Sequence, residues 1–244
     1  MSLVYSAFVP HPPIIIPEIG RGEERVCAKT IESYQTIARR FVECKVERVV
    51  IISPHAKLLP EGVSILKGDR LVGDLGRFGR PDVNFAYVND HELREKLMEA
   101  LPQAVPIEGW LDHGTMVPLY FLRQAGWDGM ILVMSMPLTD PEIYGQALGK
   151  VLRDSSENYG LVASGDMSHC LKADGPYGFH PAGPKYDHLV VELLRKNPEL
   201  IRSIPEDLTE EAAECGHRSL IAGLAAKTGA VEVLSYEGPF GVGY

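Results

Sequence analysis

Four of the eight histidines stand in predicted loops that contain proline or glycine, where an imidazole can reach a shared site. These are His11, His55, His113 and His169. Imidazole is the commonest metal ligand in proteins, and it also titrates nearest to neutral pH. A cluster of this kind can hold a metal ion and keep groups for proton transfer. We predict two ligands and two catalytic histidines.

The position of these histidines in the sequence sets them apart from the others. An isolated histidine is a surface or structural side chain about three times in four, and His91 and His188, in charged segments with helical spacing, fit that description. Three of the four loop histidines instead come directly after apolar runs. The pairs are run 3–9 with His11, run 47–53 with His55, and run 159–164 with His169.

The elements that must position these side chains alternate along the chain. Apolar runs predict strands at 3–9, 47–53, 129–136, 159–164 and 230–236. Amphipathic spacing predicts helices over 22–45, 90–100, 117–124, 141–153, 184–196 and 216–226. The glycine-rich stretch 56–87 predicts hairpins and loops, and His113 falls in a predicted loop at 111–115.

This alternation predicts a single α/β domain over residues 1–244, with a largely parallel or mixed central sheet flanked by helices on both faces. Ligands of such sheets bind beyond the carboxyl ends of the strands. We therefore expect His11, His55 and His169 to converge at that edge.

An oxygen-activating metal site commonly adds one carboxylate to two histidines, on one face of the ion. Glu214, Glu237 and Asp166 lie near the ends of predicted elements and are candidates for this ligand. Cys215 offers a thiolate instead, because the macrodipole of the predicted helix would lower its pKa. A small buried residue is an equally good interpretation of Cys215.

The overall composition excludes several classes of partner. The net charge of -9 and the absence of a dense Lys/Arg block argue against nucleic acid. Apolar runs such as 129–136 are far too short to span a membrane, and residues 1–5 lack the basic start of a signal peptide. The four cysteines form no CxxC pair. We expect a cytoplasmic protein with reduced thiols.

Four motifs, in this order, resemble those of the catalytic subunits of class III extradiol ring-cleavage dioxygenases. They are Phe8-Val9-Pro10-His11-Pro12-Pro13, Ser53-Pro54-His55, Leu111-Asp112-His113-Gly114 and Gly165-Asp166-Met167-Ser168-His169. The stretches 214–220 and 236–241 are similar to the prokaryotic branch related to the Memo proteins. The resemblance spans nearly the whole chain.

The resemblance implies a mononuclear non-heme Fe(II) centre, with zinc or copper as alternative metals. His11 and His55 match the iron-ligand positions of the family, and Glu214 matches the carboxylate ligand. Memo-like relatives carry a cysteine at this place, so Cys215 is the alternative third ligand. Such a centre binds the two oxygens of a catechol, binds dioxygen beside them and opens the ring.

The same resemblance implies roles for the remaining site residues. His169 is our choice for the base that removes the second proton of the diol, and His113 for the donor to dioxygen. The sequence allows these two roles to be exchanged. His180 and Glu237 are expected substrate contacts.

Three functions are compatible with these residues. The first is cleavage of a small aromatic diol by dioxygen. The second is a Memo-like metal protein with a redox or partner-binding role and no ring cleavage, since kinship of fold does not fix function. The third is a zinc hydrolase, because two histidines and a carboxylate also bind zinc. A homodimer is our working expectation for the assembly.

Overall fold

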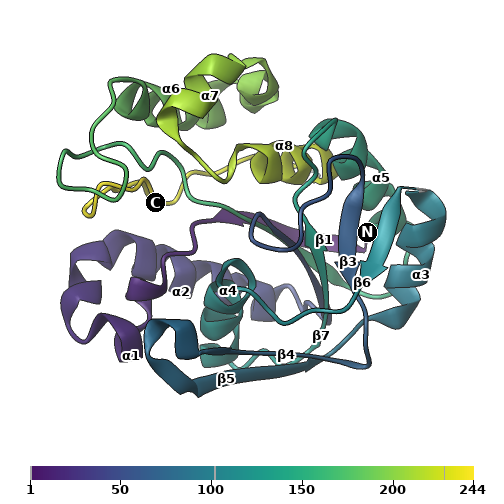
Figure 1. The fold of residues 1–244 in the computed structure, drawn as a ribbon. Coiled ribbons are helices and arrows are strands. Elements are labelled where there is room, and N and C mark those ends of the chain that lie inside the picture. The colour runs from purple at the N-terminus through teal and green to yellow at the C-terminus, as the bar shows by residue number, and fades with distance from the viewer. Residues whose placement is uncertain (1, 102, 228) are drawn as a thin grey trace.

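A six-stranded sheet forms the centre of the protein, in the order β1-β8-β2-β7-β3-β6 (Figure 1). The computed structural model describes residues 2–101, 103–227 and 229–244. The strands are β1 (Leu3–Val9), β2 (Arg48–Ser53), β3 (Val63–Leu66), β6 (Ala104–Ile107), β7 (Met130–Ser135) and β8 (Tyr159–Ser164). β3 is antiparallel to β7, and the other neighbours are parallel. The predicted α/β fold is confirmed, with a mixed sheet.

Helices cover both faces of this sheet. On one face lie α2 (Ala28–Glu43) and α4 (His113–Gln124); on the other lie α3 (His91–Ala100), α5 (Pro141–Arg153) and α8 (His217–Ala226). Side chains alternate between the faces of a strand. Val49 of β2 accordingly belongs to the first core and Val50 to the second. Burial on both faces explains why the central strands are continuous apolar runs.

Smaller elements complete the domain around these layers. Helices α6 (Ala182–Lys196) and α7 (Glu206–Ala212) build a third core against α8, on its side away from the sheet (Figure 1). Strands β4 (Arg70–Leu75) and β5 (Arg80–Val88) form an antiparallel hairpin that contacts α4. The short helix α1 (Pro17–Gly20) precedes α2. No helix within the described ranges has both the length and the apolar character needed to cross a membrane.

The predicted strand at 230–236 is wrong. This segment forms no strand in the described chain and is held to α2 by side chains. Arg40 donates to Glu232 at 2.7 Å, and Ser33 donates to Ser235 at 2.7 Å. The apolar run therefore belongs to a segment without regular secondary structure that lies beside a helix.

Some helix boundaries also differ from the prediction. The helix predicted over 22–45 begins only at Ala28, after a 3-10 turn at Glu23–Cys27. The helix predicted over 117–124 begins earlier, at His113, because Asp112 caps it. The sequence analysis missed β6 and α7, which have four and seven residues. Elements this short carry little periodic signal.

Candidate metal centre

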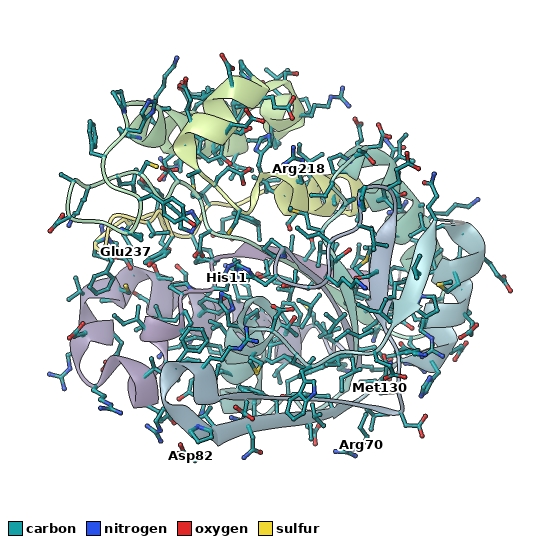
Figure 2. The ribbon with its side chains drawn as sticks, viewed as in Figure 1. His11, Arg70, Asp82, Met130, Arg218 and Glu237 are labelled. Atoms are coloured by element: carbon teal, nitrogen blue, oxygen red, sulfur yellow. The ribbon has the colours of Figure 1, made fainter. Side chains whose placement is uncertain are left out.

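Three neighbouring strands bring the predicted ligands to one edge of the sheet. His11 follows β1 by two residues, Asp166 follows β8 by two, and His55 follows β2 by two. Because β8 lies between β1 and β2, these side chains converge beyond the carboxyl ends of the strands. The sequence predicts the convergence of His11, His55 and His169, and Asp166 joins them. Figure 2 shows His11 in the middle of the molecule, between the sheet and the C-terminal segments.

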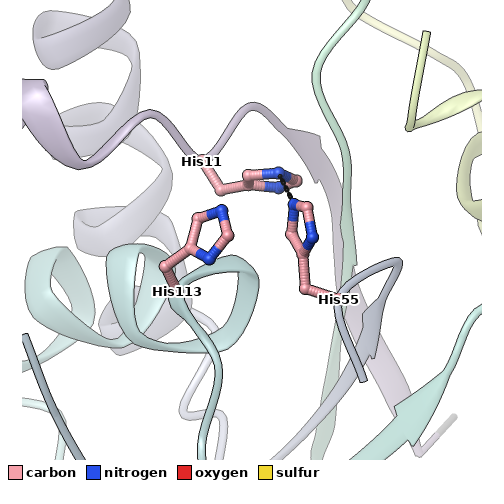
Figure 3. A group of neighbouring side chains, drawn as sticks. All are labelled: His11, His55 and His113. Atoms are coloured by element: carbon pink, nitrogen blue, oxygen red, sulfur yellow. Dashed lines mark hydrogen bonds between the residues drawn. The ribbon is translucent and has the colours of Figure 1, made fainter. Parts of the chain in front are cut away.

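His11 and His55 meet through their Nε2 atoms, which lie 2.9 Å apart (Figure 3). Two imidazole nitrogens that bind one ion at about 2.1 Å, at right angles, lie about 3.0 Å apart. The observed separation therefore fits two ligands of the same ion. His11 is buried and His55 is exposed, so the pair extends from the interior of the protein to its surface.

His113 completes a group of three imidazoles. It is the first residue of α4, where Asp112 accepts a hydrogen bond from the Thr115 amide at 3.1 Å. Its ring centroid lies 4.0 Å from that of His55 and 5.2 Å from that of His11. Each of the three histidines offers a nitrogen within 4.8 Å of the others. Capping by Asp112 thus places His113 at the centre.

A second group of possible ligand atoms shares His11 and meets the same nitrogen, Nε2. Asp166 Oδ2 is 3.9 Å from His11 Nε2, and Cys215 Sγ is 3.7 Å from the same nitrogen. One ligand atom from each of these three residues falls within a 4.8 Å group. Asp166 Oδ2 also lies 3.9 Å from His169 Nε2. This carboxylate is therefore central to the site.

Close contact between β8 and α8 brings Cys215 to Asp166. A Cβ atom on Gly165 would overlap Gly216, so the two backbones can touch only because both residues are glycine. The Cys215 amide donates to the Asp166 carbonyl at 3.3 Å, and the Asp166 amide lies 3.2 Å from Cys215 Sγ. These contacts hold the sulfur beside His11.

Glu214, the preferred third ligand from the sequence, takes a different position. Its carboxylate accepts a hydrogen bond from the amide of His217, the first residue of α8. Among the described residues it joins neither group of candidate ligands. Asp166 is the carboxylate beside His11, and Cys215, the predicted alternative, also lies there. The sequence places Glu214 correctly near a helix start, but its carboxylate is turned to the first amide of the helix and away from His11.

His169 has a fixed orientation at the same edge. Its Nδ1 lies 2.6 Å from the carbonyl oxygen of Ala213, which can only accept a hydrogen bond. Nδ1 therefore carries the proton and Nε2 keeps a free lone pair. The ring also meets Tyr177 edge-on, with centroids 5.4 Å apart.

Burial dominates the electrostatics of the centre. It lowers the pKa of His11 well below the usual value, with help from His55 and His169. It also lowers the pKa of His113 to about 3, with smaller effects of His55, His11 and Arg77. Both rings are neutral near pH 7, the form in which imidazole binds metal.

The two anionic candidates show the opposite shift. Burial raises the pKa of Asp166 to about 6, against the lowering effect of the His11 amide and of His169 and His55. Burial, followed by the charge of Asp166, raises the pKa of the Cys215 thiol. The predicted lowering of the Cys215 pKa is therefore wrong, because burial raises it. A bound cation would favour both anions.

The predicted substrate contacts lie away from the imidazole group. Oε1 of Glu237 accepts hydrogen bonds from the amide and hydroxyl of Thr30, both at 2.7 Å, so it ties the C-terminal segment to α2 (Figure 2). His180 is exposed, and its Nδ1 accepts from the Ala182 amide at 3.3 Å at the start of α6. Neither residue belongs to the two candidate ligand groups in the described chain.

Two aromatic residues that the sequence analysis missed border the site instead. Tyr177 contacts His169, and Phe78 meets the His113 ring at 5.5 Å. Both are exposed, at 69% and 37%. Their position in glycine-containing loops between predicted elements is the one signal that could have suggested them.

Comparison with known proteins identifies the family of the chain. Residues 5–244 match the family described as the catalytic LigB subunit of aromatic ring-opening dioxygenase. The chain belongs to this family, which confirms the resemblance seen in its motifs.

Two relatives illustrate the range of similarity. The chain is 36% identical over 265 residues to Protein CA_C1420 of Clostridium acetobutylicum, with 100% of this chain and 57% of that protein covered. It thus spans little more than half of that relative. The crystal structure of uncharacterized protein JW3007 from Escherichia coli K12 has a similar fold, with a TM-score of 0.64 and 18% identity. That match covers 88% of this chain and 91% of the other.

Proposed function

We propose that this protein is a non-heme Fe(II)-dependent extradiol dioxygenase, which opens the ring of a catechol-type aromatic diol with dioxygen. The observation that carries the proposal is the arrangement around His11. Its Nε2 lies 2.9 Å from that of His55 and 3.9 Å from Asp166 Oδ2. Two histidines and one carboxylate are the ligand set of many non-heme Fe(II) oxygenases. Membership of a ring-opening dioxygenase family supports the same conclusion.

The residues that would hold the iron are His11, which both groups of candidate ligand atoms share, His55 of the first group and Asp166 of the second. This set keeps the two predicted histidines and replaces Glu214, whose carboxylate binds the His217 amide at the start of α8. When bound, the metal lowers the pKa of the diol and holds diol and dioxygen together. His55 is exposed while His11 and Asp166 are buried, so the substrate has access from the His55 side.

His169 is the proposed general base. The carbonyl of Ala213 fixes its proton on Nδ1, so the lone pair of Nε2 is available to accept a proton. This nitrogen lies 3.9 Å from Asp166 Oδ2, one of the proposed ligand atoms. It is therefore placed to take the proton of the second hydroxyl of a diol bound there.

His113 is the proposed hydrogen-bond donor to negative charge that develops on the reacting oxygen atoms. Because its pKa is lowered to about 3, the ring is neutral and donates through one N–H. Phe78 shields one edge of this ring, which strengthens a hydrogen bond by keeping water away.

Cys215 favours a second candidate function. Its sulfur lies 3.7 Å from His11 Nε2, at nearly the distance of the Asp166 carboxylate. A thiolate ligand suits zinc or copper better than Fe(II). The chain would then be a Memo-like metal protein with a redox or partner-binding role and no ring cleavage.

Reconstitution with iron distinguishes the two candidates. The protein is loaded with Fe(II) without oxygen, mixed with a panel of catechols and exposed to air. We expect oxygen uptake and a yellow ring-opened product with at least one diol. His11→Ala should lose both signals, whereas His188→Ala, at a histidine with 83% side-chain exposure, should keep them. An iron-loaded protein that consumes no oxygen with any diol would refute the dioxygenase and favour the Memo-like function.

A further inference from the structure

Three strands of the central sheet end in a fully buried serine. Ser53 ends β2, Ser135 ends β7 and Ser164 ends β8. The three hydroxyls have different partners. Ser135 accepts from the Ser64 amide at 2.9 Å, and Ser53 donates to Asp112 at 2.7 Å. Among the three, Ser164 has an imidazole as its partner.

The partners of Ser164 fix the direction of its hydrogen bonds. Its Oγ lies 2.6 Å from the Gly114 carbonyl oxygen and 2.9 Å from His11 Nδ1. A carbonyl oxygen can only accept, so the single hydroxyl proton goes to Gly114. Toward His11 the hydroxyl must therefore accept, and His11 carries its proton on Nδ1. The lone pair of His11 then lies on Nε2, the atom that faces His55 and Cys215.

The hydrogen bond between the two histidines agrees with this assignment. Because His11 Nε2 carries no proton, the contact of 2.9 Å requires His55 Nε2 to donate in the metal-free protein. An ion bound between the nitrogens would replace that proton, and such release of protons is general for metal binding.

We infer that Ser164 is a positioning residue of the metal centre, which holds His11 in the tautomer that presents Nε2 to an ion. The inference rests on the metal-binding function proposed above. Ser164 also joins β8 to the first turn of α4, which carries His113. One buried hydroxyl thus orients the His11 ring and anchors the backbone turn that carries His113. Metal-binding histidines usually have such a partner on their second nitrogen.

The packing of the first turn of α4 leaves little freedom for this connection. A Cβ atom on Gly114 would lie 2.6 Å from Ser53 Oγ, so a larger residue would push the turn away from the strand ends. Ser53 in turn binds Asp112, the cap of α4. Ser53 and Ser164, from adjacent strands, therefore both bind the start of α4. Of these two hydroxyls, that of Ser164 also contacts His11.

The ¹⁵N resonances of the histidines in the metal-free protein test the tautomer directly. We expect wild-type His11 to show the Nδ1–H form, and Ser164→Ala to shift it toward the Nε2–H form. Ser135→Ala is the matched control, since it removes a buried strand-end hydroxyl with no histidine partner, and should leave His11 unchanged. An Nε2–H form in the wild type, or no change in Ser164→Ala, would overturn the inference whatever the protein does with metal.

Metal affinity provides the second measurement. Calorimetry with Co(II) should show about 10- to 100-fold weaker binding for Ser164→Ala, and recovery in Ser164→Thr, which keeps the hydroxyl. The visible spectrum of the Co(II) protein should change in Ser164→Ala and not in Ser135→Ala. Equal affinity of the wild type and a folded Ser164→Ala would refute the positioning role. A wild type that binds no metal would refute the proposed function instead, and the tautomer would still decide the role of Ser164.

Discussion

Nδ1 of His169 lies 2.6 Å from the carbonyl oxygen of Ala213, the residue that ends α7. Ala213 has a left-handed backbone conformation, with φ of 51°. A helix end leaves carbonyl groups without partners inside the helix, and one of them here binds an imidazole. α7, which is absent from the sequence-based prediction, therefore orients the residue proposed as the base.

His169→Ala should separate catalysis from metal binding. The proposed ligands are His11, His55 and Asp166, so this variant should retain iron. Loss of a general base typically lowers kcat by about 10² to 10⁴. Iron content after desalting and the rate of ring opening measure the two effects. If His169→Ala loses its iron along with its activity, His169 belongs among the ligands.

Loss of either histidine ligand should abolish metal retention. His11→Ala removes the nitrogen shared by both candidate groups, and His55→Ala removes the nitrogen 2.9 Å from it. Metal analysis after gel filtration should find less than about a tenth of the wild-type metal content. Mutation of a residue that only hydrogen-bonds to a ligand already lowers metal affinity about tenfold or more, so loss of the ligand itself should cost at least as much. His188→Ala should match the wild type. Full metal content in both ligand variants would disprove the site.

The identity of the third ligand can be decided by two substitutions. Asp166→Asn keeps an oxygen that can accept from the His11 amide, a contact of 2.7 Å, and removes the negative charge. We expect it to weaken Fe(II) binding at least about tenfold, since a metal-bound carboxylate contributes charge as well as an oxygen. Cys215→Ser should bind Fe(II) nearly as tightly as the wild type. The reverse order would assign the site to the thiolate and favour zinc or copper.

The convergence of the histidines could be predicted because it follows from the sheet. The run 47–53 contains four consecutive apolar residues, Val49 to Ile52, which indicates a strand buried on both faces. Parallel strands of this kind end at the same edge, so His11 and His55 had to lie near each other. The prediction needed only the strand ends and not the side-chain directions.

The third ligand could not be predicted in the same way. Glu214 and Asp166 both lie close to predicted element ends, and the difference between them is the direction of a side chain. Glu214 turns toward the His217 amide, whereas the contact of Gly165 with Gly216 turns Asp166 and Cys215 toward His11. Such contacts between distant segments leave no periodic trace in the sequence.

Asp187→Asn should reduce the pH dependence of stability. Asp187 is fully buried, and it accepts hydrogen bonds from the Ser168 amide at 2.9 Å and the Tyr236 hydroxyl at 2.7 Å. Burial raises its pKa from 3.8 to about 6, although both hydrogen bonds act in the opposite direction. The ionised form is therefore less favourable in the folded protein than in the unfolded chain.

Because the pKa of Asp187 is raised on folding, its protonated form contributes to the free energy of unfolding. This contribution is fully present below pH 3.8 and is lost as the pH rises through about 6. Asp187 should lower the free energy of unfolding by up to about 3 kcal/mol between pH 4 and 7, from about 1.4 kcal/mol per pKa unit. Asparagine does not titrate. The free energy of unfolding of Asp187→Asn, measured in urea, should therefore fall less steeply than that of the wild type over this pH range. Asp174→Asn, at an exposed aspartate, is the control and should follow the wild type. Equal slopes for Asp187→Asn and the wild type would show that Asp187 ionises as easily in the folded protein as in the unfolded chain.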